Sequence, residues 1–164
     1  LFILLLIPVF NYLLYPFLSR FFTITPLRKI GIGLFVMGLA FTMVAFVQVA
    51  VDNGQTPHMG WQILACALLT SSEVMVSITG LEFAYTQAPR QMKSFILSLF
   101  LLTVSLGNVL AGEVKAILVN ADGSSKLPGA QEFWLWTGLI TVTAVVFVFV
   151  SRSYQPKEYL QVEE

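Results

Sequence analysis

Charge is the property that this sequence has least of. Only 11% of its 164 residues are charged and 57% are hydrophobic, whereas soluble domains carry about 25% charged residues. A soluble fold of this length would lack the polar side chains needed to cover its surface, while lipid accepts an apolar exterior. The formal net charge is zero, so no basic surface indicates a nucleic acid partner. These shortages predict an all-α membrane protein embedded in a lipid bilayer.

Residues for covalent or metal chemistry are also scarce. The single cysteine, Cys66, excludes an intramolecular disulfide and has no Cys or His at ligand spacing, so we expect it to pack between helices. His58 stands alone in a loop, where we expect it to be solvated. The sequence contains no HExxH, GxSxG, Walker A or glycine-rich dinucleotide motif. We therefore predict no enzyme activity, no metal and no cofactor.

Long apolar runs are what the sequence does contain. Five are long enough to cross roughly 30 Å of hydrocarbon, at about 1–18, 30–51, 61–85, 92–118 and 133–150. We expect residues 1–151 to form a transmembrane bundle and 152–164 to form a polar tail. Because the chain opens in the apolar run Leu1-Phe2-Ile3-Leu4, without a basic leader, we interpret it as beginning inside a transmembrane helix of a longer protein.

The basic residues orient these spans in the membrane. Seven of the nine would lie on one side, namely Arg20, Arg28, Lys29, Arg90, Lys93, Arg152 and Lys157. Lys115 and Lys126 would lie on the other. Because cytoplasmic loops carry an excess of Lys and Arg, the first span is predicted to run inward and the C-terminal tail to be cytoplasmic.

Glu73 is the most informative residue, because an ionisable group inside a span is costly and its presence usually has a reason. It lies about twelve residues beyond Trp61, near the expected bilayer midplane. At about 100° per residue, Ser77, Gly80 and Ala84 should share its helical face. A carboxylate at this depth is either protonated or paired with a cation, and both states suit transport. The alternative is a packing carboxylate bonded to a Ser, an Asn or the backbone.

Other polar or aromatic positions in the spans are secondary candidates. Glu82, near the cytoplasmic end, is expected to pair with Arg or Lys and to hold or gate the structure. Asn108 is expected to make an interhelical hydrogen bond. Asn11, between two prolines, is a cavity candidate, and the sequence leaves open whether Phe100 lines a cavity or faces lipid.

The third span leads into an unusually specific block of residues, comprising Glu73-Val74, Thr79 to Phe83, Gln87 to Pro89 and Met92 to Ser94. This block closely resembles the tenth transmembrane helix of the proton-dependent oligopeptide transporters, a branch of the major facilitator superfamily. Weaker matches occur in the same order, at Ile7-Pro8-Val9-Phe10, at Thr25 to Lys29 and at Leu101-Leu102-Thr103 with Gly107-Asn108. The resemblance covers nearly the whole chain, as helices eight to twelve of twelve and hence as part of the C-terminal six-helix bundle.

The resemblance implies a symporter that imports di- and tripeptides with protons by alternating access, in the plasma membrane and with the N-terminal half of the same transporter as its partner. It implies that Glu73 binds the peptide amino terminus and takes part in proton coupling, and that Ser77 lines the cavity. Phe100 and Asn11 are further candidates for substrate binding. Glu82, Gly80 and Asn108 are candidates for gating or structural roles.

Two departures and two alternatives accompany this interpretation. Family members often carry tryptophan where this chain has Phe100, so selectivity for peptide side chains is open. The loop Asp52–Gly60 lacks the large extracellular insert of animal members, which favours a bacterial origin. One alternative keeps the fold but changes the solute, to an amino acid or nitrate. The other is a non-transporting membrane scaffold, because five helices alone cannot build a two-bundle carrier.

Overall fold

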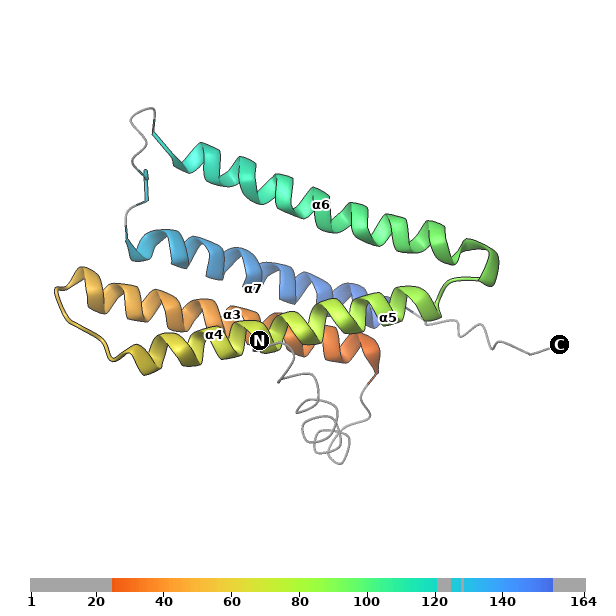
Figure 1. Cartoon of the computed structure of the whole chain (residues 1–164), viewed down its shortest axis with the longest axis horizontal. Helices are drawn as coiled ribbons and strands as arrows, with labels where there is room; N and C mark the ends of the chain where they lie inside the picture. The colour runs from red at the N-terminus through yellow and green to blue at the C-terminus, as the bar shows by residue number, and fades with distance from the viewer. Residues whose placement is uncertain (1–24, 121–124, 128, 155–164) are drawn as a thin grey trace. The chain divides into compact units, whose positions relative to one another are not determined.

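The computed structural model describes residues 25–120, 125–127 and 129–154. Its helices, in chain order, are α3 (Pro26–Asp52), α4 (Met59–Glu73), the π-helix η2 (Val74–Ile78), α5 (Thr79–Thr86), the 3₁₀ turn η3 (Arg90–Met92), α6 (Lys93–Leu118) and α7 (Ala130–Ser153) (Figure 1). Between α6 and α7, the described residues include an isolated β-bridge from Val119 to Ser125. The predicted all-α fold is confirmed in the described part of the chain.

Four helical segments are long and apolar enough to cross a membrane, namely Pro26–Asp52, Met59–Thr86, Lys93–Leu118 and Ala130–Ser153. They coincide with the last four predicted spans, and no end differs by more than about four residues. The first predicted span, at 1–18, lies outside the described residues, as does most of the predicted tail. The structure therefore describes four of the five predicted spans.

Local capping explains why two helices begin earlier than their apolar runs. Thr25 accepts a hydrogen bond from the Arg28 backbone N–H at 3.4 Å, and Pro26 occupies the start of α3. A threonine cap followed by proline favours a helix start. His58 caps α4, because its Nδ1 accepts from the Gly60 backbone N–H at 3.1 Å. His58 is thus a helix cap as well as an exposed loop residue.

The described chain forms two compact units. The first contains α3, α4, η2 and α7 and extends into α5 as far as Gly80. The second begins at Leu81 and contains the rest of α5, with η3 and α6. The boundary thus falls inside the third span, directly after η2.

Helix α3 is the centre of the first unit and contacts both α4–η2 and α7 (Figure 1). Its buried small residues follow two seven-residue repeats. Gly31, Gly38 and Ala45 form one, and Gly33 and Ala40 form the other. A Cβ on Gly31 or Gly38 would meet α7 side chains, whereas one on Gly33 would meet Met75 and Val76 of η2. Each repeat therefore lies on the seam between α3 and one neighbour, meaning the face of α3 that packs against that helix.

The neighbours of α3 bury small residues at the same interval. The buried residues of α7 are Ala130, Thr137 and Ala144, and α4 buries Ala65 and Ser72. A seven-residue repeat keeps one stripe of a helix against a partner that runs nearly parallel or antiparallel to it. Small residues at such seams let helix backbones approach closely, which is the main source of packing energy inside a bilayer.

Asp52 joins the end of α3 to the start of α7. Its Oδ2 accepts from the backbone N–H of Ala130 at 2.9 Å, and its Oδ1 accepts from Gln48 Nε2 at 2.9 Å. The carboxylate thus satisfies an N–H at a helix start that would otherwise lack a partner. Gly129 makes room for this contact, since its φ is 64° and an added Cβ would collide with the Asp52 carboxylate. The rings of Phe46 and Trp134 pack edge to face beside this join, with centroids 5.4 Å apart.

Two lysines make contacts at the two ends of α6 in the second unit. Lys93 Nζ lies 4.1 Å from the centre of the Tyr85 ring, a cation–π contact that spans the short turn between α5 and α6. At the other end of α6, the Lys126 ammonium donates to the Ile117 carbonyl at 2.6 Å, and its backbone N–H donates to Leu118 at 2.7 Å. A cation at the carboxyl end of a helix satisfies carbonyls and complements the helix dipole.

Candidate functional site

Glu73 lies half-way along the 28-residue helix Met59–Thr86, at the last residue of α4. Its side chain is exposed. The structure therefore places this carboxylate at the middle of a candidate membrane span, as the sequence predicted. It also shows a feature that the sequence reading missed, because a π-helix begins at the next residue, Val74.

The π-turn Val74–Ile78 changes the direction of every side chain that follows it. A π-helix closes i→i+5 hydrogen bonds, so the turn holds about one residue more than an α-turn and rotates later positions by about 100°. Ser77 remains exposed one turn beyond Glu73, but Gly80 is half-buried. The prediction that Gly80 and Ala84 continue the Glu73 face in uninterrupted α-helical register is therefore wrong.

Three consecutive hydroxyl residues precede this turn and help to explain it. Thr70 donates to the Cys66 carbonyl at 2.8 Å, Ser71 to Ala67 at 2.7 Å, and Ser72 to Leu69 at 2.7 Å. Hydroxyls that bond to carbonyls three or four residues back compete with the helical backbone and often bend helices. The run Thr70-Ser71-Ser72 was the sequence signal that could have predicted an irregular turn here.

Close packing against α3 holds the π-turn in place. An ideal Cβ on Gly33 would lie 2.8 Å from Val76 Cγ2, 3.0 Å from Met75 Cβ and 3.4 Å from the Ser72 carbonyl oxygen. Both Val74 and Met75 are buried. Two consecutive buried side chains fit a widened turn, whose extra residue points inward. The absence of a side chain at Gly33 thus makes room for the turn that adjoins Glu73.

The remaining predicted site residues lie outside the unit that contains Glu73 or outside the described residues. Glu82, Phe100 and Asn108 belong to the second unit, and Asn11 lies outside the described residues. Glu82 and Asn108 are exposed, and Phe100 is half-buried. The ion pair expected for Glu82 and the interhelical bond expected for Asn108 remain predictions. Cys66 is exposed, so its predicted packing role does not hold within the described part of the chain.

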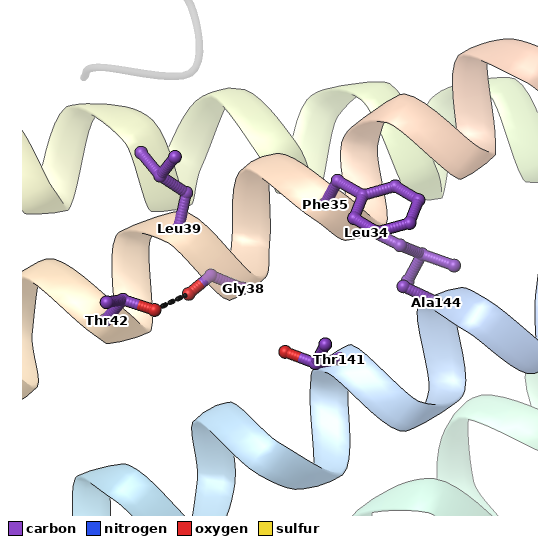
Figure 2. Close-up of a pocket in the computed structure, with 7 residues that line it drawn as sticks. All are labelled: Leu34, Phe35, Gly38, Leu39, Thr42, Thr141 and Ala144. Atoms are coloured by element: carbon purple, nitrogen blue, oxygen red, sulfur yellow. Dashed lines mark hydrogen bonds between the residues drawn. The ribbon is translucent and has the colours of Figure 1, made fainter.

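A cavity of about 260 Å³ lies between α3 and α7 (Figure 2), and its lining consists of Leu34, Phe35, Gly38, Leu39, Thr42, Thr141 and Ala144. The Thr42 hydroxyl donates to the Gly38 carbonyl at 2.8 Å, and the Thr141 hydroxyl donates to Thr137 at 2.7 Å. The lining carries no charged side chain and none of the predicted site residues. Its surface suits apolar groups and does not suit a charged ligand.

Comparison with known proteins shows which family this chain resembles. Residues 1–135 match the family described as PTR2, the POT family. The chain is 34% identical to the peptide transporter PTR2 of Saccharomyces cerevisiae over 168 aligned residues, which is 93% of this chain and 26% of that protein. It is 40% identical to solute carrier family 15 member 1 of Oryctolagus cuniculus, over 60% of this chain and 13% of that protein.

Solved structures agree with the sequence matches. The fold resembles the crystal structure of an auto-inhibited peptide transporter of the POT family, with a TM-score of 0.87, 35% identity, and coverage of 99% of this chain and 33% of that one. It also resembles the POT family transporter PepTSo, with a TM-score of 0.84, 37% identity, and coverage of 96% and 32%. The chain thus spans between 13% and 33% of the length of these relatives.

Proposed function

The chain belongs to the POT family, and on that premise we propose that it is the C-terminal part of a proton-coupled symporter that imports di- and tripeptides by alternating access. Its relatives are named as peptide transporters and its helices suit a multi-pass membrane protein. Because the chain spans only 26% of the yeast relative, transport is the activity of a longer protein. We assign the N-terminal half of that protein as the partner that completes the cavity.

The observation that carries this proposal is the exposed carboxylate of Glu73 at the middle of the third span. When ionised, the carboxylate pairs with the ammonium group of a peptide amino terminus; when protonated, it carries a proton across the low-dielectric core. The two states exclude each other at one site, which gives a simple physical route to coupling between protons and peptide. Ser77, exposed one turn further along, supplies a hydroxyl next to the same ligand.

The other assigned residues act around this centre. Phe100 and Asn11 are proposed to contact peptide side chains or backbone from neighbouring helices. Glu82, Gly80 and Asn108 are assigned to the inner gate and its support.

The membrane orientation follows from charge. We assign the chain to the plasma membrane with its C-terminus in the cytoplasm, because the basic residues alternate between loops in the order that the positive-inside rule requires. In this orientation the peptide enters from the end of α4 that begins at Met59, and Glu73 meets it half-way across. Lys115 and Lys126, near the carboxyl end of α6, lie on the outer side.

Proton-driven uptake by the complete transporter tests the assignment. In proteoliposomes with an imposed pH gradient, Glu73→Gln should abolish concentrative uptake of a labelled dipeptide, since the amide neither ionises nor carries a proton. The matched control is Glu113→Gln, the same change near the carboxyl end of α6, which should keep uptake. Normal concentrative uptake by Glu73→Gln would refute the role of Glu73. Competition by nitrate or a free amino acid, but not by dipeptides, would refute the peptide substrate.

A further inference from the structure

Helix α4 carries a line of polar side chains that leads outward from Glu73. Gln62, Cys66, Thr70 and Glu73 are spaced by four, four and three residues, an interval that places them on one face of an α-helix. All four lie within α4 or at its last residue, before the π-turn begins. Gln62, Cys66 and Glu73 are exposed, and Thr70 is half-buried. We call these four residues the outer track.

The outer track is distinct from the side of α4 that packs against α3. That side is marked by the buried residues Ala65 and Ser72, which lie about a third of a turn around the helix. The side of α4 opposite the track, which includes Leu64, is exposed and apolar, as a surface facing lipid should be. The helix therefore presents one seam, one apolar sector and one polar line.

The track covers the outer half of the membrane. Gln62 is next to Trp61 at the start of the span, and Glu73 is at its middle, about 16 Å further along the helix axis at 1.5 Å per residue. Amide, hydroxyl and carboxylate groups that face hydrocarbon at these depths cost free energy unless they meet water, protein or a polar solute. A continuous polar line from the interface to Glu73 is the arrangement that a polar solute needs to reach that carboxylate.

The hydrogen-bonding capacity of the track fits a solute that donates. The Thr70 hydroxyl already donates to the Cys66 carbonyl at 2.8 Å, so only its acceptor lone pairs remain for a ligand. The Glu73 carboxylate is likewise an acceptor when ionised. A peptide ammonium group and backbone N–H groups are donors. The regular α-helical part of the track ends at the π-turn, which rotates the residues after Ile78 away from this face.

We propose that the outer track is the wall along which a peptide travels from outside to Glu73, and that Thr70 is a binding residue whose hydroxyl oxygen accepts from the peptide. This inference rests on the proposed function. It extends the substrate contacts from Glu73 to Thr70, while Cys66 and Gln62 border the path without a hydrogen bond to the peptide. The native thiol of Cys66 can therefore be labelled to test whether this path is accessible from outside.

The first experiment uses that thiol in the complete transporter, with cysteines elsewhere replaced by serine. A membrane-impermeant cationic methanethiosulfonate applied from outside should modify Cys66 and block dipeptide uptake, and saturating dipeptide should slow the modification. Cys66→Ala should transport and resist the reagent. The matched control, Leu64→Cys in the Cys66→Ala background, lies at nearly the same depth on the apolar sector and should react slowly, without protection by dipeptide.

The second experiment separates binding from structure. Thr70→Val keeps the shape but removes the acceptor oxygen, and should raise KM for a dipeptide by about 2- to 10-fold with kcat little changed, the range expected for one hydrogen bond. Thr70→Ser should restore KM. If proton-driven dipeptide uptake persists while Cys66 reacts no faster than Leu64→Cys, or while Thr70→Val leaves KM unchanged, the track is refuted and the proposed function stands. Absence of dipeptide uptake in the unmodified transporter would refute both.

Discussion

Gly33 offers the sharpest test of how the fold supports the site. Its missing side chain is the space into which the π-turn packs, since an added Cβ would lie 2.8 Å from Val76 Cγ2. Ordinary van der Waals contact begins at about 3.4 Å for such pairs. Gly33→Ala must therefore push Val76 away by roughly 0.6 Å, or move the two helices apart. Val76 directly precedes Ser77, so this displacement reaches the proposed cavity face.

The size of the effect can be isolated with a control in the same helix. Gly31 is also buried in α3, but an added Cβ there would lie 3.8 Å from the Phe147 ring, which is ordinary contact. Replacing glycine by alanine in a helix stabilises by roughly 0.5–1 kcal/mol through backbone entropy, and this gain applies to both sites. Overpacking costs about 1–3 kcal/mol and applies only to Gly33→Ala. The free energies of unfolding should therefore differ by about 1–3 kcal/mol, with Gly31→Ala the more stable.

Two measurements on the complete transporter check this reasoning. Reversible unfolding in mixed detergent micelles gives the difference in free energy between Gly33→Ala and Gly31→Ala. Proteoliposome uptake of a labelled dipeptide should be reduced by Gly33→Ala and kept by Gly31→Ala. If the two variants unfold within about 0.5 kcal/mol of each other and transport alike, the close contact between α3 and the π-turn does not constrain the site.

The remaining predictions concern two contacts outside the site, the Asp52 cap at the start of α7 and the cation–π contact between Lys93 and Tyr85. Asp52→Ala should lower the free energy of unfolding by about 0.5–2 kcal/mol, because the Ala130 N–H loses its cap. Asp52→Asn keeps an acceptor and should lose less stability. Equal losses for the two variants in a denaturation series would contradict the capping role. Gly129→Ala should cost about 1–3 kcal/mol in the same assay, from positive φ and collision with Asp52, and a neutral result would contradict that geometry. A double-mutant cycle of Tyr85→Leu and Lys93→Met should give a coupling of about 0.5–1 kcal/mol, while Tyr85→Phe should keep the coupling; a coupling near zero would show that the ring and the ammonium act independently.

The spans were predictable because their signal is local. A run of about 20 apolar residues satisfies its backbone polar groups internally whatever surrounds it, so composition alone located four helices that the structure describes. The ends were less well placed where capping decided them. The Thr25 hydroxyl and the ring of Pro26 start α3 four residues before its apolar run, and this depends on side-chain chemistry rather than on hydropathy.

The position of Glu73 was also predictable, but its surroundings were not. Counting residues from Trp61 sufficed to put the carboxylate near mid-span. The π-turn that follows it depends on competition among three hydroxyls and on the space at Gly33, which lies 40 residues earlier in the sequence. A face calculated at a constant angle per residue could not include that turn, so Gly80 was assigned to the wrong face.

The sequence by itself determined that this chain is a set of apolar helices, that one of them carries a carboxylate at mid-depth, and that its motifs resemble those of peptide transporters. These properties reside in composition and in residues close together along the chain. Only the tertiary structure decided which helix faces pack against a neighbour. A seven-residue repeat of glycine, alanine, serine or threonine identifies a packing face only when the position of the partner helix is known. The tertiary structure also decided that Asp52 caps a helix 78 residues away and that the site helix widens at η2, since both depend on contacts between segments that the sequence keeps apart.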